Sequence, residues 1–190
     1  SQSDAQFLAD HSRHDPDFFW QSILGCTSVY NKQLEMARAV RDHNRVAVVG
    51  ANGTGKDWQS ARVMLWWMAT RSPAICVVLG PTHRQVSDIV WKEARSAYLT
   101  ARMPLGGQMY RTARWEYDDR RYAVGFSTDN EYNIQGFHSP NLLVILTEAH
   151  NIEQSHIDAV KRLNPARMLL TGNAFASSGE FYDAFHGGSE

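Results

Sequence analysis

The sequence predicts an α/β fold in which helices cover both faces of a mostly parallel sheet. Short apolar runs alternate along the chain with longer stretches of helical periodicity. Parallel strands need crossover connections, and helices usually provide them, so this alternation favours parallel pairing. The chain has 190 residues, of which 43% are hydrophobic. It can therefore bury one substantial core, and a single α/β domain is the simplest arrangement.

Two helices are expected ahead of the first strand. Asp15-Pro16 is a good helix start for residues 17–24. Asn31 can cap a second helix over residues 32–43, which carries apolar residues at helical spacing.

The following core is expected to alternate strands with helices. Residues 108–127 differ, because aromatic and apolar residues there flank the turn Asp118-Asp119-Arg120. This pattern predicts an antiparallel hairpin added to one edge of the sheet. The remaining patterns predict strands at 45–49, 74–79, 142–146 and 167–171, and helices at 58–70, 84–100 and 153–163.

A glycine-rich turn follows the first predicted strand. Gly50-Ala51-Asn52-Gly53-Thr54-Gly55-Lys56 has the spacing of a phosphate-cradling P-loop, between a β-branched run and a helical pattern. Glycines let backbone N–H groups surround an anion, and the next helix directs its positive end at the phosphates. The motif predicts a nucleoside triphosphate site, with Lys56 as a mobile charge for the terminal phosphates. The alternative is a glycine-rich turn that binds nothing.

A second candidate segment follows the strand at 142–146. This strand ends in Thr147-Glu148, and its acid stands on the side of an α/β sheet where ligands bind. We expect Glu148 to orient the water that attacks ATP, because phosphoryl transfer depends on positioning more than on covalent help. The alternative is that Glu148 caps a helix or faces solvent.

Both motifs depart from the usual pattern, and the departures are reciprocal. Asp57 stands where a P-loop normally offers a Ser or Thr hydroxyl to magnesium, and Thr147 stands where an acid normally meets the magnesium shell. Magnesium prefers oxygen ligands and often uses one or two carboxylates. We therefore expect Asp57 to bind Mg²⁺ directly or through water and to be oriented by Thr147. The alternative is a weakened site that binds nucleotide but hydrolyses it slowly or not at all.

With both motifs placed, residues 30–186 resemble the ATPase domain of a tailed-phage terminase large subunit, the motor that drives DNA into a preformed capsid. This resemblance implies a P-loop NTPase three-layer sandwich whose central sheet is mostly parallel and of the additional-strand type. It also implies ATP and Mg²⁺ as cofactors. The other segments that carry it are Gln33, Trp66-Trp67-Met-Ala-Thr-Arg71, Gly80-Pro-Thr-His-Arg-Gln85, Gln135-Gly-Phe-His138, Thr171-Gly-Asn173 and Phe181-Tyr-Asp-Ala-Phe-His186.

The resemblance also implies roles for single residues. Gln33 would recognise adenine, residues 50–57 would hold the phosphates, and Glu148 would be the catalytic carboxylate. Thr171, Gly172 and Asn173 would form the coupling segment that responds to the γ-phosphate. The positions that usually hold an arginine finger are Ala51, Asn52 and Gln135 here, so the candidates are Arg84, Arg111, Arg114, Arg120 and Arg121.

The domain organisation follows from the same comparison. We expect lead-in helices over residues 1–44 and an ATPase core over residues 45–186. Residues 187–190 resemble the start of a linker to a C-terminal nuclease domain, so nuclease activity is not expected of this chain. The implied partners are double-stranded DNA, the portal protein, the terminase small subunit and a ring of identical copies, although the chain alone could be a monomer.

Composition limits these expectations. The net charge is −1, so any DNA contact must be local or shared among subunits. No run approaches the ~18 apolar residues of a membrane span, and Cys26 and Cys76 lack metal-ligand spacing. Both observations favour the host cytoplasm. Two other functions stay open: a helicase-like P-loop ATPase acting on nucleic acid, and a nucleotide-binding module with weakened hydrolysis.

Overall fold

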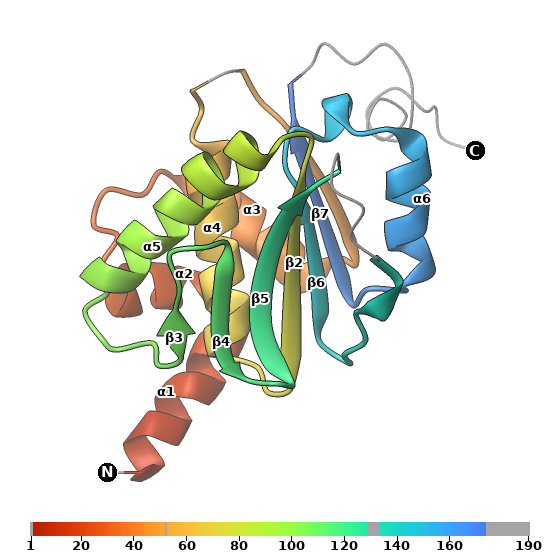
Figure 1. The fold of residues 1–190 in the computed structure, drawn as a ribbon. Helices are drawn as coiled ribbons and strands as arrows, with labels where there is room; N and C mark the ends of the chain where they lie inside the picture. The colour runs from red at the N-terminus through yellow and green to blue at the C-terminus, as the bar shows by residue number, and fades with distance from the viewer. Residues whose placement is uncertain (1, 52, 129–133, 174–190) are drawn as a thin grey trace.

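The computed structural model describes residues 2–51, 53–128 and 134–173, which form a seven-stranded sheet between two helical layers (Figure 1). The strands are β1 (Arg45–Val49), β2 (Ala74–Gly80), β3 (Gln108–Met109), β4 (Arg114–Asp118), β5 (Arg121–Ser127), β6 (Leu142–Leu146) and β7 (Arg167–Gly172). The main helices are α1 (Gln2–His14), α2 (Pro16–Phe18), α3 (Asn31–Asp42), α4 (Lys56–Ala69), α5 (Trp91–Thr100) and α6 (Gln154–Arg162). Shorter helical segments are η1 (Phe19–Ile23), η2 (Arg84–Val90), η3 (Ile134–Gly136) and η4 (Ala149–Asn151).

The sheet has the strand order β1-β7-β6-β2-β5-β4-β3. Neighbours from β1 to β5 in this order run parallel, whereas β4 and β3 are antiparallel. The predicted mostly parallel sheet with an antiparallel hairpin at one edge is therefore confirmed. β7 lies between β1, which leads into the glycine-rich turn, and β6, which leads into Glu148. It is the additional strand of this type of sheet.

Strand residues alternate between two cores. Cys76 and Val78 of β2 belong to the core that includes α3, α4 and α5. Ile75, Val77 and Leu79 belong to the core on the α6 side. Figure 1 shows α3, α4 and α5 on one face of the sheet and α6 on the other. A strand buried on both faces explains why the parallel strands read as continuous apolar runs in the sequence.

Helix α4 is buried along most of its length, from Gln59 to Met68. The indole N–H of Trp66 donates to the carbonyl of Ser12 at 2.7 Å, which joins α4 to α1. The indole N–H of Trp67 donates to the carbonyl of Asn141 at 2.9 Å. Both tryptophans therefore pack in the core with their polar atoms satisfied.

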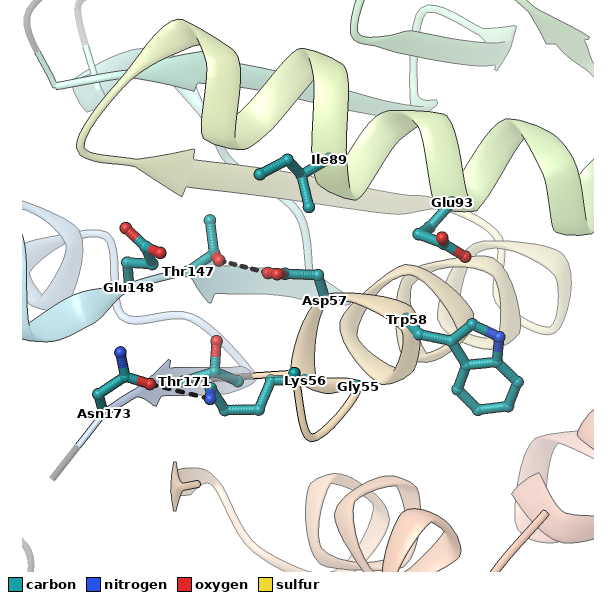
Figure 2. Close-up of a pocket in the computed structure, with 11 residues that line it drawn as sticks. Gly55, Lys56, Asp57, Trp58, Ile89, Glu93, Thr147, Glu148, Thr171 and Asn173 are labelled. Atoms are coloured by element: carbon teal, nitrogen blue, oxygen red, sulfur yellow. Dashed lines mark hydrogen bonds between the residues drawn. The ribbon is translucent and has the colours of Figure 1, made fainter. Parts of the chain in front are cut away.

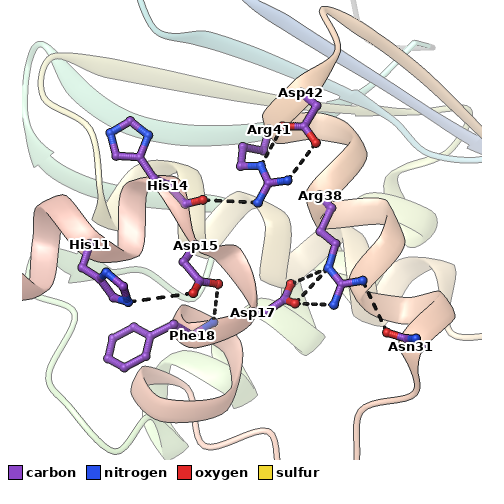
Figure 3. Close-up of polar contacts among 9 residues, drawn as sticks. All are labelled: His11, His14, Asp15, Asp17, Phe18, Asn31, Arg38, Arg41 and Asp42. Carbon is purple, nitrogen blue, oxygen red and sulfur yellow. Dashed lines mark hydrogen bonds and ion pairs between the residues drawn. The ribbon is translucent and has the colours of Figure 1, made fainter.

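The helices ahead of the sheet are tied together by polar contacts (Figure 3). The predicted helix start at Asp15-Pro16 is confirmed, because Asp15 Oδ1 accepts a hydrogen bond from the Phe18 N–H at 3.0 Å. Arg38 of α3 donates through Nε and Nη2 to the carboxylate of Asp17, with an Nε–Oδ2 distance of 2.8 Å. This two-point contact fixes the α2 segment against α3.

Two local predictions are corrected by the structure. Asn31 does not cap α3: it is the first helical residue, and the extended residue before it is Tyr30. The Tyr30 N–H instead donates to Gln33 Oε1 at 3.1 Å, so a side chain inside the helix makes the capping contact. Helix α1 was not predicted, and the predicted helix over 84–100 begins with the π-helical turn η2 before it continues as α5. Within the described ranges, no helix is long and apolar enough to cross a bilayer.

Candidate nucleotide-binding site

The predicted site segments meet at one edge of the sheet. The carboxyl ends of β1, β7, β6 and β2 lie side by side in the parallel register. The Gly50 N–H donates to the carbonyl of Gly172 at 3.1 Å, and the Thr147 N–H donates to the carbonyl of Leu79 at 2.9 Å. The glycine-rich turn, the coupling segment and the Thr147-Glu148 pair are therefore adjacent, where parallel α/β sheets bind ligands.

A cavity of about 250 Å³ opens between these segments (Figure 2). Figure 2 shows Glu148, Thr147 and Asp57 in one row and Asn173, Thr171 and Lys56 in a second row. The lining residues are Gly53, Gly55, Lys56, Asp57, Trp58, Ile89, Glu93, Thr147, Glu148, Thr171 and Asn173.

The glycine-rich turn has the backbone geometry of an anion-binding loop. Gly53 and Gly55 both have φ of 78°, a left-handed conformation that glycine adopts without steric cost. A Cβ at Gly50 would lie 2.7 Å from Thr54 Oγ1, so the loop has no room for a larger residue there. Gly55 caps α4 and directs its free N–H groups and positive end toward the cavity. Ala51 is exposed beside the turn, and Asn52 lies outside the described residues.

Lys56 is held by three acceptors. Its ammonium donates to the carbonyls of Gly50 at 2.7 Å and Ala51 at 2.8 Å, and to Asn173 Oδ1 at 3.0 Å. These bonds use all three ammonium hydrogens. Burial lowers the pKa of Lys56, while the carboxylates of Asp57 and Glu148 act in the opposite direction. A phosphate that binds Lys56 must replace at least one of these acceptors.

Asp57 and Thr147 are brought together, as the reciprocal exchange requires. The Thr147 hydroxyl donates to Asp57 Oδ1 at 2.9 Å. Gln85, at the start of η2, joins the pair: its Nε2 donates to Asp57 Oδ1 and to Thr147 Oγ1, each at 3.0 Å. The three side chains therefore form a closed hydrogen-bonded ring at the wall of the cavity.

The backbone at Glu148 is strained. Its φ of 49° and ψ of 45° are left-handed, a conformation that residues other than glycine rarely adopt. Strain of this kind is often stored at functional sites. Two residues later, His150 Nδ1 accepts a hydrogen bond from the Asn173 N–H at 3.2 Å, which ties the Glu148 loop to the coupling segment. Burial lowers the pKa of His150, which favours the neutral ring that this contact needs.

The oxygen donors around the cavity fit a hard divalent cation. Asp57 supplies a carboxylate beside the Thr147 hydroxyl, and Thr171 adds a buried hydroxyl that has no hydrogen-bond partner within the described part of the chain. No group of three or more His, Cys, Asp or Glu side chains with metal-binding geometry occurs among the described residues. The described residues therefore offer the carboxylate and hydroxyl oxygens that Mg²⁺ prefers, but not a ligand cluster made by the protein alone.

A larger cavity of about 930 Å³ lies on the other side of the glycine-rich turn. It shares Gly53, Gly55 and Lys56 with the first cavity, so the two meet at the loop. Gln33 lines it, with Nε2 3.6 Å from the position of a Cβ built on Gly55. Gln33, the residue predicted to recognise adenine, therefore has its side-chain amide beside this larger cavity and not beside the smaller one.

The strand register separates the five candidate arginines. Arg120 and Arg121 lie at the sheet edge opposite the cavity, because Arg121 pairs with Ala74 at the start of β2. Arg121 also donates to the carbonyls of Met68 and Ala69 at the end of α4. The geometry of Arg121 is therefore that of a structural residue, and Arg120 is exposed in the turn at the same edge.

Of the other three arginines, Arg111 and Arg84 lie toward the carboxyl edge of the sheet, and Arg114 lies level with the middle of β2. Arg114 is paired with Glu116 at 2.8 Å. Arg111 and Arg84 are exposed, at the entry to β4 and at the start of η2. These two side chains are placed where a neighbouring molecule could meet them.

Sequence reasoning gave no role to two residues that the structure places at the site. Gln85 appeared only within the segment Gly80-Pro-Thr-His-Arg-Gln85 that carries the resemblance, and His150 was interpreted, with His138, as an ordinary polar or packed histidine and not as a metal ligand. Both stand within five residues of a strand's carboxyl end, the region where parallel sheets bind ligands. That position was the available signal, but it does not say which way a side chain faces.

Solved structures with a similar fold come from phage packaging proteins. The large terminase ATPase domain of Thermus phage P74-26 matches with a TM-score of 0.66 at 19% identity, covering 94% of this chain and 76% of that chain. The large terminase of bacteriophage HK97 matches with a TM-score of 0.66 at 15% identity, covering 88% of this chain. The large terminase of a thermophilic bacteriophage in complex with ADP matches with a TM-score of 0.57 at 15% identity, covering 77% of this chain.

This chain spans 38% of the length of the last two proteins. No protein-family model matches the sequence, and no curated protein matches it. Identities below a fifth support the fold alone. The chain has the P-loop α/β fold of large terminase ATPase domains, which confirms the resemblance at the level of structure.

Proposed function

We propose that this chain is the ATPase motor domain of a viral terminase large subunit, which hydrolyses ATP to move double-stranded DNA into a procapsid. One observation carries the proposal: Lys56 and Glu148 line a single cavity at the carboxyl edge of a sheet shared with large terminase ATPase domains. The similar terminase solved with ADP supports a nucleotide as the ligand.

In the proposed mechanism, the phosphates bind the N–H groups between Gly50 and Lys56, and Lys56 turns from its carbonyl acceptors to a phosphate oxygen. Asp57, oriented by the Thr147 hydroxyl, would hold Mg²⁺, which would supply positive charge against the negative charge that develops on the phosphates. Glu148 holds the attacking water in line with the γ-phosphate. Asn173 accepts from Lys56, so loss of the γ-phosphate changes the contacts of the coupling segment Thr171-Gly172-Asn173.

The same proposal covers assembly. The chain would act in a ring of copies at the portal, with the terminase small subunit and double-stranded DNA. In such a ring, a neighbouring copy would supply the arginine that acts on the nucleotide. Arg111 and Arg84 are the proposed trans-acting arginines, because they are exposed and lie toward the edge that holds the cavity. The proposed location is the host cytoplasm, at the procapsid portal.

A specific observation favours a second candidate, a nucleotide-binding module with weakened hydrolysis. Asp57 replaces the hydroxyl that P-loops usually offer to Mg²⁺, and its carboxylate is already bonded to Thr147 and Gln85. This reading predicts tight nucleotide binding without turnover.

The test is steady-state phosphate release from ATP with Mg²⁺, measured together with nucleotide binding. Glu148→Ala should abolish release and keep binding, whereas the matched control Glu153→Ala changes an exposed acid outside the cavity and should leave both intact. Binding without turnover in every variant, with portal and DNA added, would favour the second candidate. Turnover stimulated by DNA without any dependence on the portal would favour a helicase-like ATPase.

A further inference from the structure

Gln85 occupies an unusual place in the candidate site. It is 5% exposed, and its single amide nitrogen bonds to both members of the exchanged pair, Asp57 and Thr147. A side-chain amide nitrogen carries two hydrogens, so both are used. The direction of the amide is settled by the pair, because the amide oxygen would be repelled by the Asp57 carboxylate. The ring therefore has one consistent hydrogen-bond arrangement.

The position of Gln85 is fixed by close packing of η2 on the sheet. A Cβ at Gly80 would lie 2.8 Å from Val86 Cγ2 and 3.0 Å from Thr147 Cγ2. A Cβ at Gly125 would lie 2.6 Å from Val86 Cγ1. Two glycines thus make room for Val86, and the neighbouring Gln85 is held at the depth of Asp57. The π-helical turn of η2 places Ile89, one turn later, on the same cavity.

The ring has a consequence for Asp57. Oδ1 accepts two hydrogen bonds, one from Gln85 and one from Thr147, while Oδ2 accepts none within the described part of the chain. One carboxylate oxygen is therefore committed to the protein. The other oxygen, Oδ2, remains for a cation or its water. The two hydrogen bonds to Oδ1 keep the carboxylate from rotating, so Oδ2 keeps its direction.

We propose that Gln85 is a positioning residue that holds the Asp57 carboxylate for Mg²⁺ and completes the exchanged pair Asp57–Thr147. This inference rests on the proposed function, since it requires a nucleotide site. Removing the amide should weaken the contribution of Mg²⁺ to nucleotide binding and leave metal-free binding unchanged. If Gln85 had only a packing role, its substitution would affect nucleotide binding equally with and without Mg²⁺.

The experiment titrates ADP into the 190-residue chain by calorimetry, in EDTA and over a series of MgCl₂ concentrations. The variants are Gln85→Met, which keeps the length and removes both donors, and Gln85→Glu, which keeps the shape and opposes Asp57. Each should need about 10- to 100-fold more Mg²⁺ for the same affinity, the usual effect of losing an outer partner of a metal ligand. Affinity of Gln85→Met for ADP in EDTA should equal that of the unchanged chain, because this substitution adds no charge beside the phosphates.

A double-mutant cycle with Thr147→Val tests the ring itself. The combined Gln85→Met and Thr147→Val variant should lose less than the product of the two single losses, because both act through Asp57. Equal Mg²⁺ dependence in the unchanged chain and both Gln85 variants would overturn the inference while leaving the nucleotide site in place. Failure of the unchanged chain to bind ADP would instead overturn the proposed function, and circular dichroism of each variant identifies any that does not fold.

Discussion

The exchange at Asp57 and Thr147 predicts that one substitution destroys a function that a second substitution restores. Asp57→Ser removes the acceptor for the Thr147 hydroxyl at 2.9 Å and for Gln85 Nε2 at 3.0 Å. Thr147 is 0% exposed and Gln85 is 5% exposed, so water cannot replace the carboxylate freely. Adding Thr147→Asp moves a carboxylate to the strand and a hydroxyl to the P-loop, which is the usual arrangement.

The magnitude follows from the contacts that are lost. A hydrogen bond to a charged group contributes about 1.5–3 kcal/mol, and groups left unsatisfied cost a similar amount. Asp57→Ser should therefore lower the free energy of unfolding by about 1–3 kcal/mol. Its ATP turnover at a fixed Mg²⁺ concentration should fall about 10- to 100-fold, which corresponds to roughly 1.4–2.7 kcal/mol in the barrier. The double variant should recover at least about tenfold of that loss.

The assay is steady-state phosphate release over a range of Mg²⁺ concentrations, with thermal unfolding measured on the same samples. Thr147→Asp alone is the matched control, because it places a second carboxylate beside Asp57 and should be worse than the double variant. Equal losses in Asp57→Ser and in the double variant would refute the exchange. In that case Asp57 and Thr147 would contribute to turnover independently, and Thr147 would not compensate for the carboxylate at position 57.

Three further predictions follow from single contacts. Glu148→Gly should be more stable than Glu148→Ala by about 1 kcal/mol in urea unfolding, because only glycine adopts the left-handed backbone at this position without strain. Both variants should lack turnover, and equal stability of the two would show that the backbone is not strained. Arg121→Met should lower the free energy of unfolding by about 1–3 kcal/mol, because it loses the hydrogen bonds to the carbonyls of Met68 and Ala69 at the end of α4. Turnover per folded molecule should be unchanged, and a specific loss of turnover would make Arg121 an arginine-finger candidate again. Burial lowers the pKa of His150 in the folded chain, so the unfolded chain binds this proton first as the pH falls. The folded state therefore has its full stability above the ordinary histidine pKa and loses part of it as the pH falls through the lowered pKa. Melting temperatures from about pH 7.5 to about pH 5 should fall less in His150→Asn, which keeps an acceptor for the Asn173 N–H without titrating, and equal slopes would exclude this contact as the cause.

The sequence predicted the parallel strands well because their signal is local. β1 and β6 match their predicted bounds, and β2 and β7 differ by one residue, since a strand buried on both faces must be a short continuous apolar run. The hairpin was predicted from its aromatic residues and turn. Capping was harder: Gln33 caps α3 from inside the helix, and the N-cap position at Tyr30 carries no capping side chain that a pattern could identify.

The candidate site divides in the same way. The phosphate loop and Glu148 are contiguous motifs, so their residues could be named from the sequence. Gln85 could not, because its place beside Asp57 and Thr147 depends on Gly80 at the end of β2 and Gly125 in β5, which together let η2 pack closely against the sheet. The arginines illustrate the same limit: Arg114 and Arg121 both belong to the hairpin, yet the strand register places Arg121 level with the start of β2 and Arg114 level with its middle.

The burial of the central part of α4 makes this helix a fixed point of reference in the molecule. Its residues 59–68 are buried on all sides, its C-terminal carbonyls are held by Arg121, and its first turn carries Lys56 and Asp57. A helix enclosed in this way cannot shift without opening the core, so we expect any movement on nucleotide binding to occur in the segments around it. Distances measured by paired probes from Ser72, an exposed residue just after α4, to η2 and to α6 would then report the movement of those two segments, and comparing the two distances would show which of them moves when nucleotide is added.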